Sequence, residues 1–299
     1  MQQHSRRGWR GRRASAPGGS DREPLAGRAA PTVSVVVPAL NEARNLPYVL
    51  ARMPIVDELI LVDGGSVDDT IAVAKRLQPD VRIVHQGRRG KGNALACGFA
   101  AASGDVVVMI DADGSTDPRE IPRFVAALVA GADFAKGSRF APHGGSADIT
   151  RIRRLGNKAL SLLVNALFGT RYSDLCYGYN AFWAHLLPIF DLDATTASRS
   201  DGRKLWGDGF EIETLLNLRA ARAGLRVTEV ASYEHSRIHG MSNLNAITDG
   251  LRVLRTIVRE WPRRVVVRGQ PWVPGQQLRE LAERATVETG PVNSGAVCK

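Results

Sequence analysis

Short apolar runs that alternate with helix-like segments constrain the fold of this chain more than any other feature. The runs are VSVVVPA, ELILVD, VRIVHQ and DVVVMID, and all four are rich in Val and Ile. Continuous apolar strands separated by helices of about ten residues are typical of a parallel sheet covered on both faces. We therefore expect an α/β fold. SVDDTIAVAKRLQ predicts one of its helices, with Ser66 and Asp69 in capping-box spacing.

Polar clusters follow three of these runs, at the points where the strands are expected to end. They are PALNE after the first run, DGGSVDD after the second and DADGS after the fourth. Open α/β sheets bind their ligands at the carboxyl ends of the parallel strands. The sequence therefore predicts a ligand site at this edge of the sheet.

Composition divides the chain into four expected parts. A tail rich in Arg, Gly and Ser at 1–30 has little to bury and is expected to be disordered. A folded α/β domain is expected at 31–245, an amphipathic basic helix with an extension at 246–268, and a flexible tail at 269–299.

Positive charge is concentrated at the two ends of the chain. The formal net charge is +10, yet residues 31–251 carry 24 basic and 24 acidic residues. A neutral middle without interleaved basic and aromatic residues argues against a nucleic-acid-binding protein. The basic ends do not define the function of the middle.

Cysteine usage and hydropathy indicate a cytoplasmic protein. Cys97, Cys176 and Cys298 are scattered and lack metal-binding spacing, which favours a reducing compartment. The Arg-rich N-terminus has no apolar stretch after it, so a signal peptide is not expected. No segment approaches the roughly 20 apolar residues that span a bilayer. Attachment to a membrane would therefore be peripheral, on the cytoplasmic face.

Asp111 and Asp113 stand one residue apart at the end of a hydrophobic strand, where two carboxylates repel each other. Gly114 permits a ligand to approach closely. Mg²⁺ binds one or two carboxylates and completes its shell with phosphate oxygens and water. A metal-bound diphosphate therefore suits this position. The alternative is that Asp113 forms a turn and Asp117 caps a helix.

Five motifs, in this order and at these intervals, closely resemble the family 2 glycosyltransferases. They are VSVVVPALNEARNL, LILVDGGSVDDT, GKGNAL, VVMIDADGSTDP and KGSRF, and the resemblance covers roughly residues 32–245. It implies the Rossmann-like GT-A fold, a nucleotide-diphosphate-sugar donor, and Mg²⁺ or Mn²⁺ held by Asp111 and Asp113. Asp113 would be the main metal ligand, and Asp111 would contact the ribose or help to bind the metal.

The same resemblance implies further contacts to the donor. The matching residues are Pro38, Asn41, Glu42, Asp63, Gly65, Ser66, Asp68, Lys91 and Gly92. Helix capping is the alternative for Ser66 and Asp68, and a solvated side chain is the alternative for Lys91. Arg139 resembles a family arginine that contacts a donor or acceptor phosphate, and we expect it to be catalytic. A salt bridge to an acidic residue is its alternative.

Two later stretches resemble the polyprenyl-phosphate sugar synthases, which transfer mannose or glucose to a lipid phosphate. They are TRIRRLGNKALSLLVNALFGTRYSDLCYGYNAF and RIHGMSNL. The basic residues suit a phosphate through charge-assisted hydrogen bonds. Those of the first stretch are Arg151, Arg153, Arg154 and Lys158, and those matching a loop near the phosphates are Arg237, His239 and Ser242. We expect inverting transfer from UDP-glucose or GDP-mannose to a polyprenyl phosphate.

A hydroxyl on a soluble acceptor is the alternative, and two glutamates distinguish the cases. A phosphate is already ionised, whereas a hydroxyl needs a base to take its proton. Glu211 lies near the position at which hydroxyl-directed relatives keep a catalytic carboxyl group, whereas Glu213 resembles a residue common to both branches. Two residues apart on a helix, they are expected to point in different directions.

The last helical segment, about 245–261, is basic and amphipathic. One face carries Ile247, Leu251, Leu254, Val258 and Trp261, and the arginines lie elsewhere. Such a helix can lie in the headgroup region of an anionic membrane. Packing against the catalytic domain is the alternative.

Two other functions fit the sequence less well. A nucleotidyltransferase would carry a glycine-rich loop near its N-terminus, but PALNEARN contains no glycine. An inactive sugar-nucleotide-binding relative would not need both Asp111 and Asp113.

Overall fold

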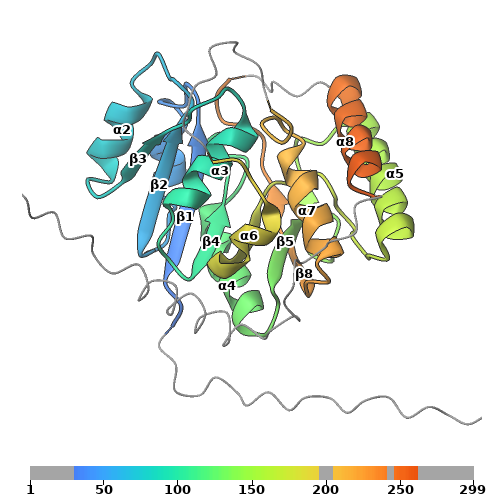
Figure 1. Cartoon of the computed structure of the whole chain (residues 1–299). Coiled ribbons are helices and arrows are strands. Elements are labelled where there is room, and N and C mark those ends of the chain that lie inside the picture. The colour runs from blue at the N-terminus through green and yellow to red at the C-terminus, as the bar shows by residue number, and fades with distance from the viewer. Residues whose placement is uncertain (1–29, 195–204, 241–245, 262–299) are drawn as a thin grey trace, which may run out of the picture. The chain divides into compact units, whose positions relative to one another are not determined.

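A seven-stranded sheet forms the centre of the structure (Figure 1), a computed structural model that describes residues 30–194, 205–240 and 246–261. The strand order is β3-β2-β1-β4-β7-β5-β8. The bounds are β1 Val33–Ala39, β2 Glu58–Asp63, β3 Arg82–His85, β4 Val106–Met109, β5 Phe134–Ser138, β7 Asn180–Trp183 and β8 Val227–Ala231. Strand β7 is antiparallel to β4 and β5, and the other neighbours are parallel. The expected α/β fold is confirmed.

Helices cover both faces of the sheet, as continuous apolar strands require. Successive residues of β1 face opposite sides, so Val35 packs in one core with Phe124, and Val36 packs in the other with Leu95. The first core includes residues of α1 (Leu46–Leu50), α2 (Thr70–Leu77) and α4 (Ile121–Val129). The second includes residues of α3 (Lys91–Ala101), α6 (Leu187–Phe190) and α7 (Ile212–Arg222). Short 3₁₀ helices precede α4 and α6, at Pro118–Glu120 and Ala184–Leu186.

The aromatic stretch YGYNAFW, whose pattern predicts no particular element, contains the antiparallel strand β7. Tyr179 stacks on Phe124 with 4.3 Å between the ring centroids, and Phe182 stacks on Phe134 at 5.7 Å. These contacts come from residues far apart in the sequence. The position of β7 in the sheet therefore follows from tertiary packing and not from a local pattern.

The expected capping box before α2 does not form. The helix begins at Thr70, and the side chain of its N-cap residue Asp69 makes no capping hydrogen bond. Instead, the Ser66 hydroxyl accepts a hydrogen bond from the Asn41 amide at 2.9 Å. The Ser66 hydroxyl therefore bonds to the loop after β1 and does not cap α2.

Helices α5 (Arg151–Phe168) and α8 (Ala246–Glu260) pack side by side beyond the β8 end of the sheet (Figure 1). Thr150 caps α5 by accepting a hydrogen bond from the Arg153 amide, and Gly169 ends it in the left-handed conformation. The buried Glu260 fixes α8 to α7 through Arg222 at 2.5 Å. None of the described helices is long and apolar enough to cross a bilayer. Strands β6 (Gly145–Ser146) and β9 (Tyr233–Glu234) form a small second sheet.

Candidate active site

A cavity of about 780 Å³ lies at the carboxyl ends of β1, β2 and β4, at the expected edge of the sheet. Residues that follow these strands line it, among them Glu42, Gly65, Asp111 and Asp113. Helix α3 contributes Lys91 at its N-terminus. Three polar clusters that the sequence places far apart therefore surround one space.

Lys91 holds two carboxylates together on one side of this cavity. Its ammonium lies 2.6 Å from Asp111 Oδ1 and 2.6 Å from Glu213 Oε1. Burial opposes the charge on Lys91, but the two carboxylates outweigh burial and raise the pKa of the ammonium. Burial raises the pKa of Glu213, although Lys91 opposes that change. Gly178 makes the arrangement possible, since a Cβ there would lie 2.3 Å from Glu213 Oε1.

Arg237 supplies the positive charge at the second aspartate. Its guanidinium lies 2.7 Å from Asp113 Oδ2 and 3.6 Å from Glu42 Oε1. Burial is the main cause of a raised pKa at Glu42. Backbone contacts hold the arginine's segment in place, because the Ile238 amide donates to the Asp113 carbonyl and the His239 amide donates to Asn45 Oδ1. Both aspartates of DADGS are therefore paired with cationic side chains of the chain itself.

The other end of the cavity is a groove between α5 and α8. Residues at helical spacing on one face of α5 line it, and α8 contributes residues from its second turn. They are Ile152, Arg153, Gly156, Asn157 and Leu160 from α5, and Asp249, Gly250, Arg252 and Val253 from α8. The cavity is thus polar at the sheet edge, whereas the groove has a mixed lining of three apolar side chains, two glycines and four polar or charged side chains.

Comparison with known proteins identifies the family. Residues 34–187 match the profile described as Glycosyl transferase family 2. This chain belongs to glycosyltransferase family 2. The confirmed membership agrees with the five motifs and makes the chain a glycosyltransferase.

Several similar proteins have names that state an activity. The polyprenol monophosphomannose synthase of Mycolicibacterium smegmatis is 32% identical over 83% of this chain and 94% of its own length. The undecaprenyl-phosphate mannosyltransferase of Micrococcus luteus is 32% identical over 66% of this chain and 81% of its own length. A crystal structure of glucosyl-3-phosphoglycerate synthase from Mycobacterium tuberculosis, in complex with Mn²⁺, UDP and glucosyl-3-phosphoglycerate, aligns with a TM-score of 0.60 and 27% identity. The alignment covers 83% of this chain and 86% of the synthase chain. This likeness confirms the GT-A fold.

The donor set of this family 2 enzyme fits a hard divalent cation that also binds phosphate. The described residues contain no group of three or more His, Cys, Asp or Glu side chains that could hold a metal alone. Asp111 and Asp113 face the same cavity, and magnesium sites commonly combine one or two carboxylates with phosphate oxygens and water. Lys91 contacts one oxygen of Asp111 and Arg237 contacts one oxygen of Asp113, so a cation at Asp113 competes with Arg237.

The expected donor residues divide into two structural groups. Those that line the cavity are Pro38, Asn41, Glu42, Gly65, Lys91, Asp111 and Asp113. Asp63, Ser66 and Asp68 hold the loops instead, because Asp63 accepts hydrogen bonds from the amides of Gly65 and Ser66, and Asp68 accepts one from the Ala43 amide. Gly92 packs against the loop before α7, where a Cβ would lie 1.7 Å from the Gly207 carbonyl oxygen.

Gln86 and Arg89 are among the cavity-lining residues that the sequence did not indicate. Both follow β3, after which the sequence indicated only Lys91 and Gly92 as donor residues. The position of Arg89 just before Lys91 is the signal that would have found it.

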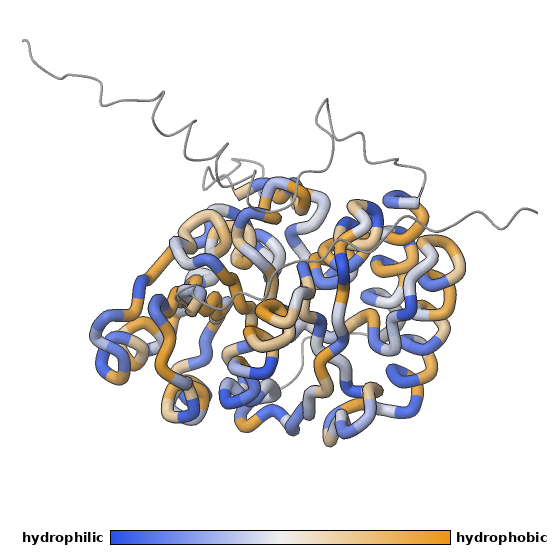
Figure 2. Tube along the Cα trace, turned by 90° about the horizontal axis from the view of Figure 1, so that it is seen from below, coloured by the Kyte–Doolittle hydropathy of each residue, from blue (hydrophilic) through white to orange (hydrophobic). Residues whose placement is uncertain are grey.

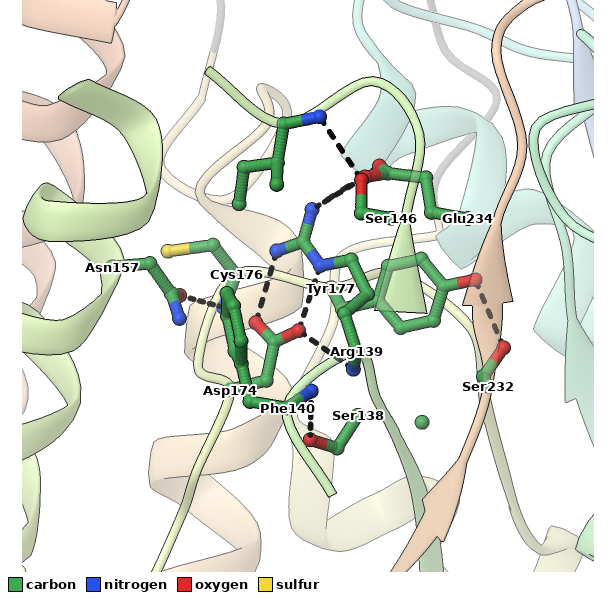
Figure 3. A network of polar contacts seen from close by, with 12 residues as sticks. Ser138, Arg139, Phe140, Ser146, Asn157, Asp174, Cys176, Tyr177, Ser232 and Glu234 are labelled. Atoms are coloured by element: carbon green, nitrogen blue, oxygen red, sulfur yellow. Dashed lines mark hydrogen bonds and ion pairs between the residues drawn. The ribbon is translucent and has the colours of Figure 1, made fainter. Parts of the chain in front are cut away.

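Arg139 forms a salt bridge with Asp174 (Figure 3), as the alternative to a phosphate contact predicted. Its guanidinium lies 2.7 Å and 2.9 Å from the two oxygens of Asp174 and 3.1 Å from both oxygens of Glu234. The centroid of the Tyr177 ring lies 4.9 Å from the guanidinium carbon of Arg139. Burial works against the charge of Asp174, but Arg139 outweighs burial and lowers the pKa of that carboxyl. Arg139 lines the cavity while it holds these two carboxylates.

Glu211 and Glu213 have different partners, in agreement with their expected separation on the helix. The Glu211 carboxylate accepts hydrogen bonds from the amides of Gly207 and Gly209, each at 3.2 Å. Glu213 contacts Lys91. Both line the cavity, but Glu213 is the one joined to Asp111 through a shared lysine.

The expected acceptor-phosphate residues are only partly brought together. Arg153 and Arg237 line the cavity, and Arg153 lies 3.3 Å from Asp148. Arg154 lies over the Phe140 ring, outside the cavity lining. The rings of His239 and Tyr48 meet edge-on, with 5.8 Å between their centroids. Ser242 lies outside the described residues.

Proposed function

We propose that this family 2 enzyme transfers a hexose, with inversion, from UDP-glucose or GDP-mannose to the phosphate of a polyprenyl carrier. One observation carries the proposal. A single cavity joins the paired aspartates at the sheet edge to a groove between α5 and α8, which is lined by both apolar and charged side chains. A nucleotide sugar fits the polar end, and an acceptor with a charged head and an apolar chain fits the rest.

The chemistry needs charge neutralisation more than a base. The bond between the anomeric carbon and the diphosphate oxygen breaks, its electron pair leaves with the nucleoside diphosphate, and an acceptor phosphate oxygen bonds to the carbon. A divalent cation on Asp111 and Asp113 would neutralise the leaving diphosphate. Lys91 and Arg237 add positive charge at the same aspartates. An ionised phosphate acceptor has no proton to lose, so Glu211 need not act.

The surface of α5 and α8 supports a membrane-bound acceptor. Figure 2 shows hydrophobic and hydrophilic residues alternating along these helices. Val253 and Ile257 are buried, whereas Ile152, Leu155, Leu251, Val258 and Trp261 are all more than half exposed. Arginines lie among them, which suits an anionic headgroup region. We propose that α8 packs on the domain with one side and attaches peripherally to the cytoplasmic face of the membrane with the other.

A soluble phosphorylated acceptor is the second candidate. The structural likeness to glucosyl-3-phosphoglycerate synthase favours it. In that case Glu211, which lines the cavity, would serve as the base for an acceptor hydroxyl.

Both functions are tested by offering two donors and two acceptors to the purified full chain with Mn²⁺. UDP-glucose and GDP-mannose are each combined with undecaprenyl phosphate in detergent or with 3-phosphoglycerate in buffer. The proposal predicts a lipid product from one donor, lost with chelator and with Asp113→Asn. Product from 3-phosphoglycerate alone would overturn the lipid assignment and support the second candidate.

A further inference from the structure

Two helix-interior glycines of the groove have no structural reason to be glycine. Gly156 lies within α5 and Gly250 within α8, and a Cβ at either position would meet nothing within 4 Å. Neither has a positive φ. Glycine is among the least favourable residues inside a helix, so alanine would stabilise both positions.

Other glycines of the same domain show what a structural requirement looks like. A Cβ at Gly98 would lie 2.3 Å from the side chain of Val36, because α3 packs closely on β1. Gly178 leaves room for Glu213 in the same way. Gly156 and Gly250 have open space at the corresponding place, and both line the cavity. Both glycines therefore line the groove without a neighbouring atom where a side chain would begin.

We infer that Gly156 and Gly250 set the width of the α5–α8 groove and thereby admit the isoprenoid chain next to the acceptor phosphate. The neighbouring lining residues are the apolar Ile152, Leu160 and Val253, the basic Arg153 and Arg252, and the polar Asn157 and Asp249, of which Asp249 is paired with Arg252 at 3.0 Å. The groove is continuous with the cavity at Asp111 and Asp113. An occupant that is apolar along the groove and anionic at the reacting end matches both properties. The inference rests on the proposed polyprenyl phosphate acceptor and assigns it a specificity determinant.

The test uses Gly156→Leu, Gly250→Leu and the double variant, with Gly156→Ala and Gly250→Ala as smaller steps. Ala166→Leu is the matched control, because Ala166 is exposed on the same helix and does not line the cavity. Steady-state transfer to undecaprenyl phosphate, donor Kd by calorimetry and Tm are measured for each protein. The donor Kd separates a blocked groove from a damaged nucleotide site.

The inference predicts that kcat/KM for undecaprenyl phosphate falls at least tenfold in each leucine variant, mostly through KM, with the donor Kd changed less than twofold. Both alanine variants should raise Tm by about 2–4 °C. Ala166→Leu should transfer as the wild type does. A folded double leucine variant that transfers to the lipid at the wild-type rate would overturn the inference and leave the proposed function standing. A wild-type protein that transfers to no prenyl phosphate would instead overturn the proposed function itself.

Discussion

The end of the cavity at the sheet edge, our proposed donor end, and the α5–α8 groove, our proposed acceptor end, differ in how their parts are held. At the donor end, loops after β1 and β2 are tied to each other by Ser66 and Asp68, and the aspartates after β4 are paired with Lys91 and Arg237. At the acceptor end, α5 and α8 leave two glycines facing open space and several large apolar side chains exposed. The donor end is built around fixed polar contacts, whereas the acceptor end is defined by the space it leaves.

The difference fits the two substrates that we propose. A nucleotide diphosphate is recognised by directed hydrogen bonds and charges, which need pre-organised partners. An isoprenoid chain offers neither, so a groove of suitable width with apolar walls is sufficient to bind it.

The largest effect is expected at the donor end. Asp113→Ala should lower transfer about a thousandfold or more, because the metal and the diphosphate lose their main carboxylate. Initial rates with saturating Mn²⁺ measure this. Asp117→Ala, in the same loop but outside the cavity lining, is the control and should lose less than tenfold. Equal losses in the two variants would contradict a special role for Asp113.

Arg139→Met tests whether this arginine belongs to the donor end or to the framework. Removing it leaves the buried Asp174 unpaired, so the free energy of unfolding should fall by about 3–5 kcal/mol. Chemical denaturation measures the change. The control Arg123→Met removes a surface ion pair in which Arg123 Nη1 lies 3.6 Å from Glu120 Oε1. It should lower the free energy of unfolding by less than about 1 kcal/mol. Unchanged stability with lost donor affinity would show instead that Arg139 binds phosphate.

The two glutamates separate the acceptor classes. With a phosphate acceptor, Glu213→Gln should lower kcat/KM about a hundredfold, since it disrupts the charge balance around Lys91 and Asp111. Glu211→Gln keeps an oxygen for the Gly207 and Gly209 amides and should lower kcat/KM less than about threefold. Loss of transfer in Glu211→Gln alone, at full stability, would indicate a base and a hydroxyl acceptor.

A substitution at Trp261, directly after α8, should have a smaller effect, on membrane binding and not on sugar transfer. Trp261→Ala should weaken binding to vesicles of anionic phospholipid about three- to tenfold, since an interfacial aromatic side chain is lost. Sedimentation with vesicles measures this. Leu77→Ala, on α2, removes another exposed apolar side chain and should have no effect. Equal binding by all three proteins would place the membrane contact elsewhere.

The smallest effect concerns pH at Glu42. Its pKa is raised above the ordinary 4.5 by burial, so the folded state holds a proton that the unfolded state releases. The stability that the protonated Glu42 contributes is fully present below pH 4.5 and is lost as the pH rises through the raised pKa. Tm measured across this pH range should therefore decline less steeply in Glu42→Gln than in the wild type. Identical slopes would exclude Glu42 as a contributor.

The meeting of three polar clusters at one edge of the sheet was predicted from the sequence because its signals are local. Each motif follows a strand directly, and parallel strands bring their ends to one edge, so Asp111, Asp113 and Glu42 could be placed together before the structure. The family and the GT-A fold followed from the same motifs and are confirmed.

What the sequence could not supply depends on pairs of distant residues. Lys91 and Glu213 are 122 positions apart, and Arg139 and Glu234 are 95 apart. No local pattern distinguishes such partners from solvated charges. The same holds for the glycines of the groove, whose meaning depends on what lies beside them in space.

The most direct test of the account is to map where the acceptor lies. A polyprenyl phosphate with a photoreactive group on its first isoprene units would be bound with Mn²⁺ and donor nucleotide, irradiated, and the labelled peptides identified by mass spectrometry. The account predicts label on the groove faces of α5 and α8, between Ile152 and Leu160 and between Gly250 and Val253. Label confined to other surfaces, in protein that still transfers sugar to the same lipid, would contradict it.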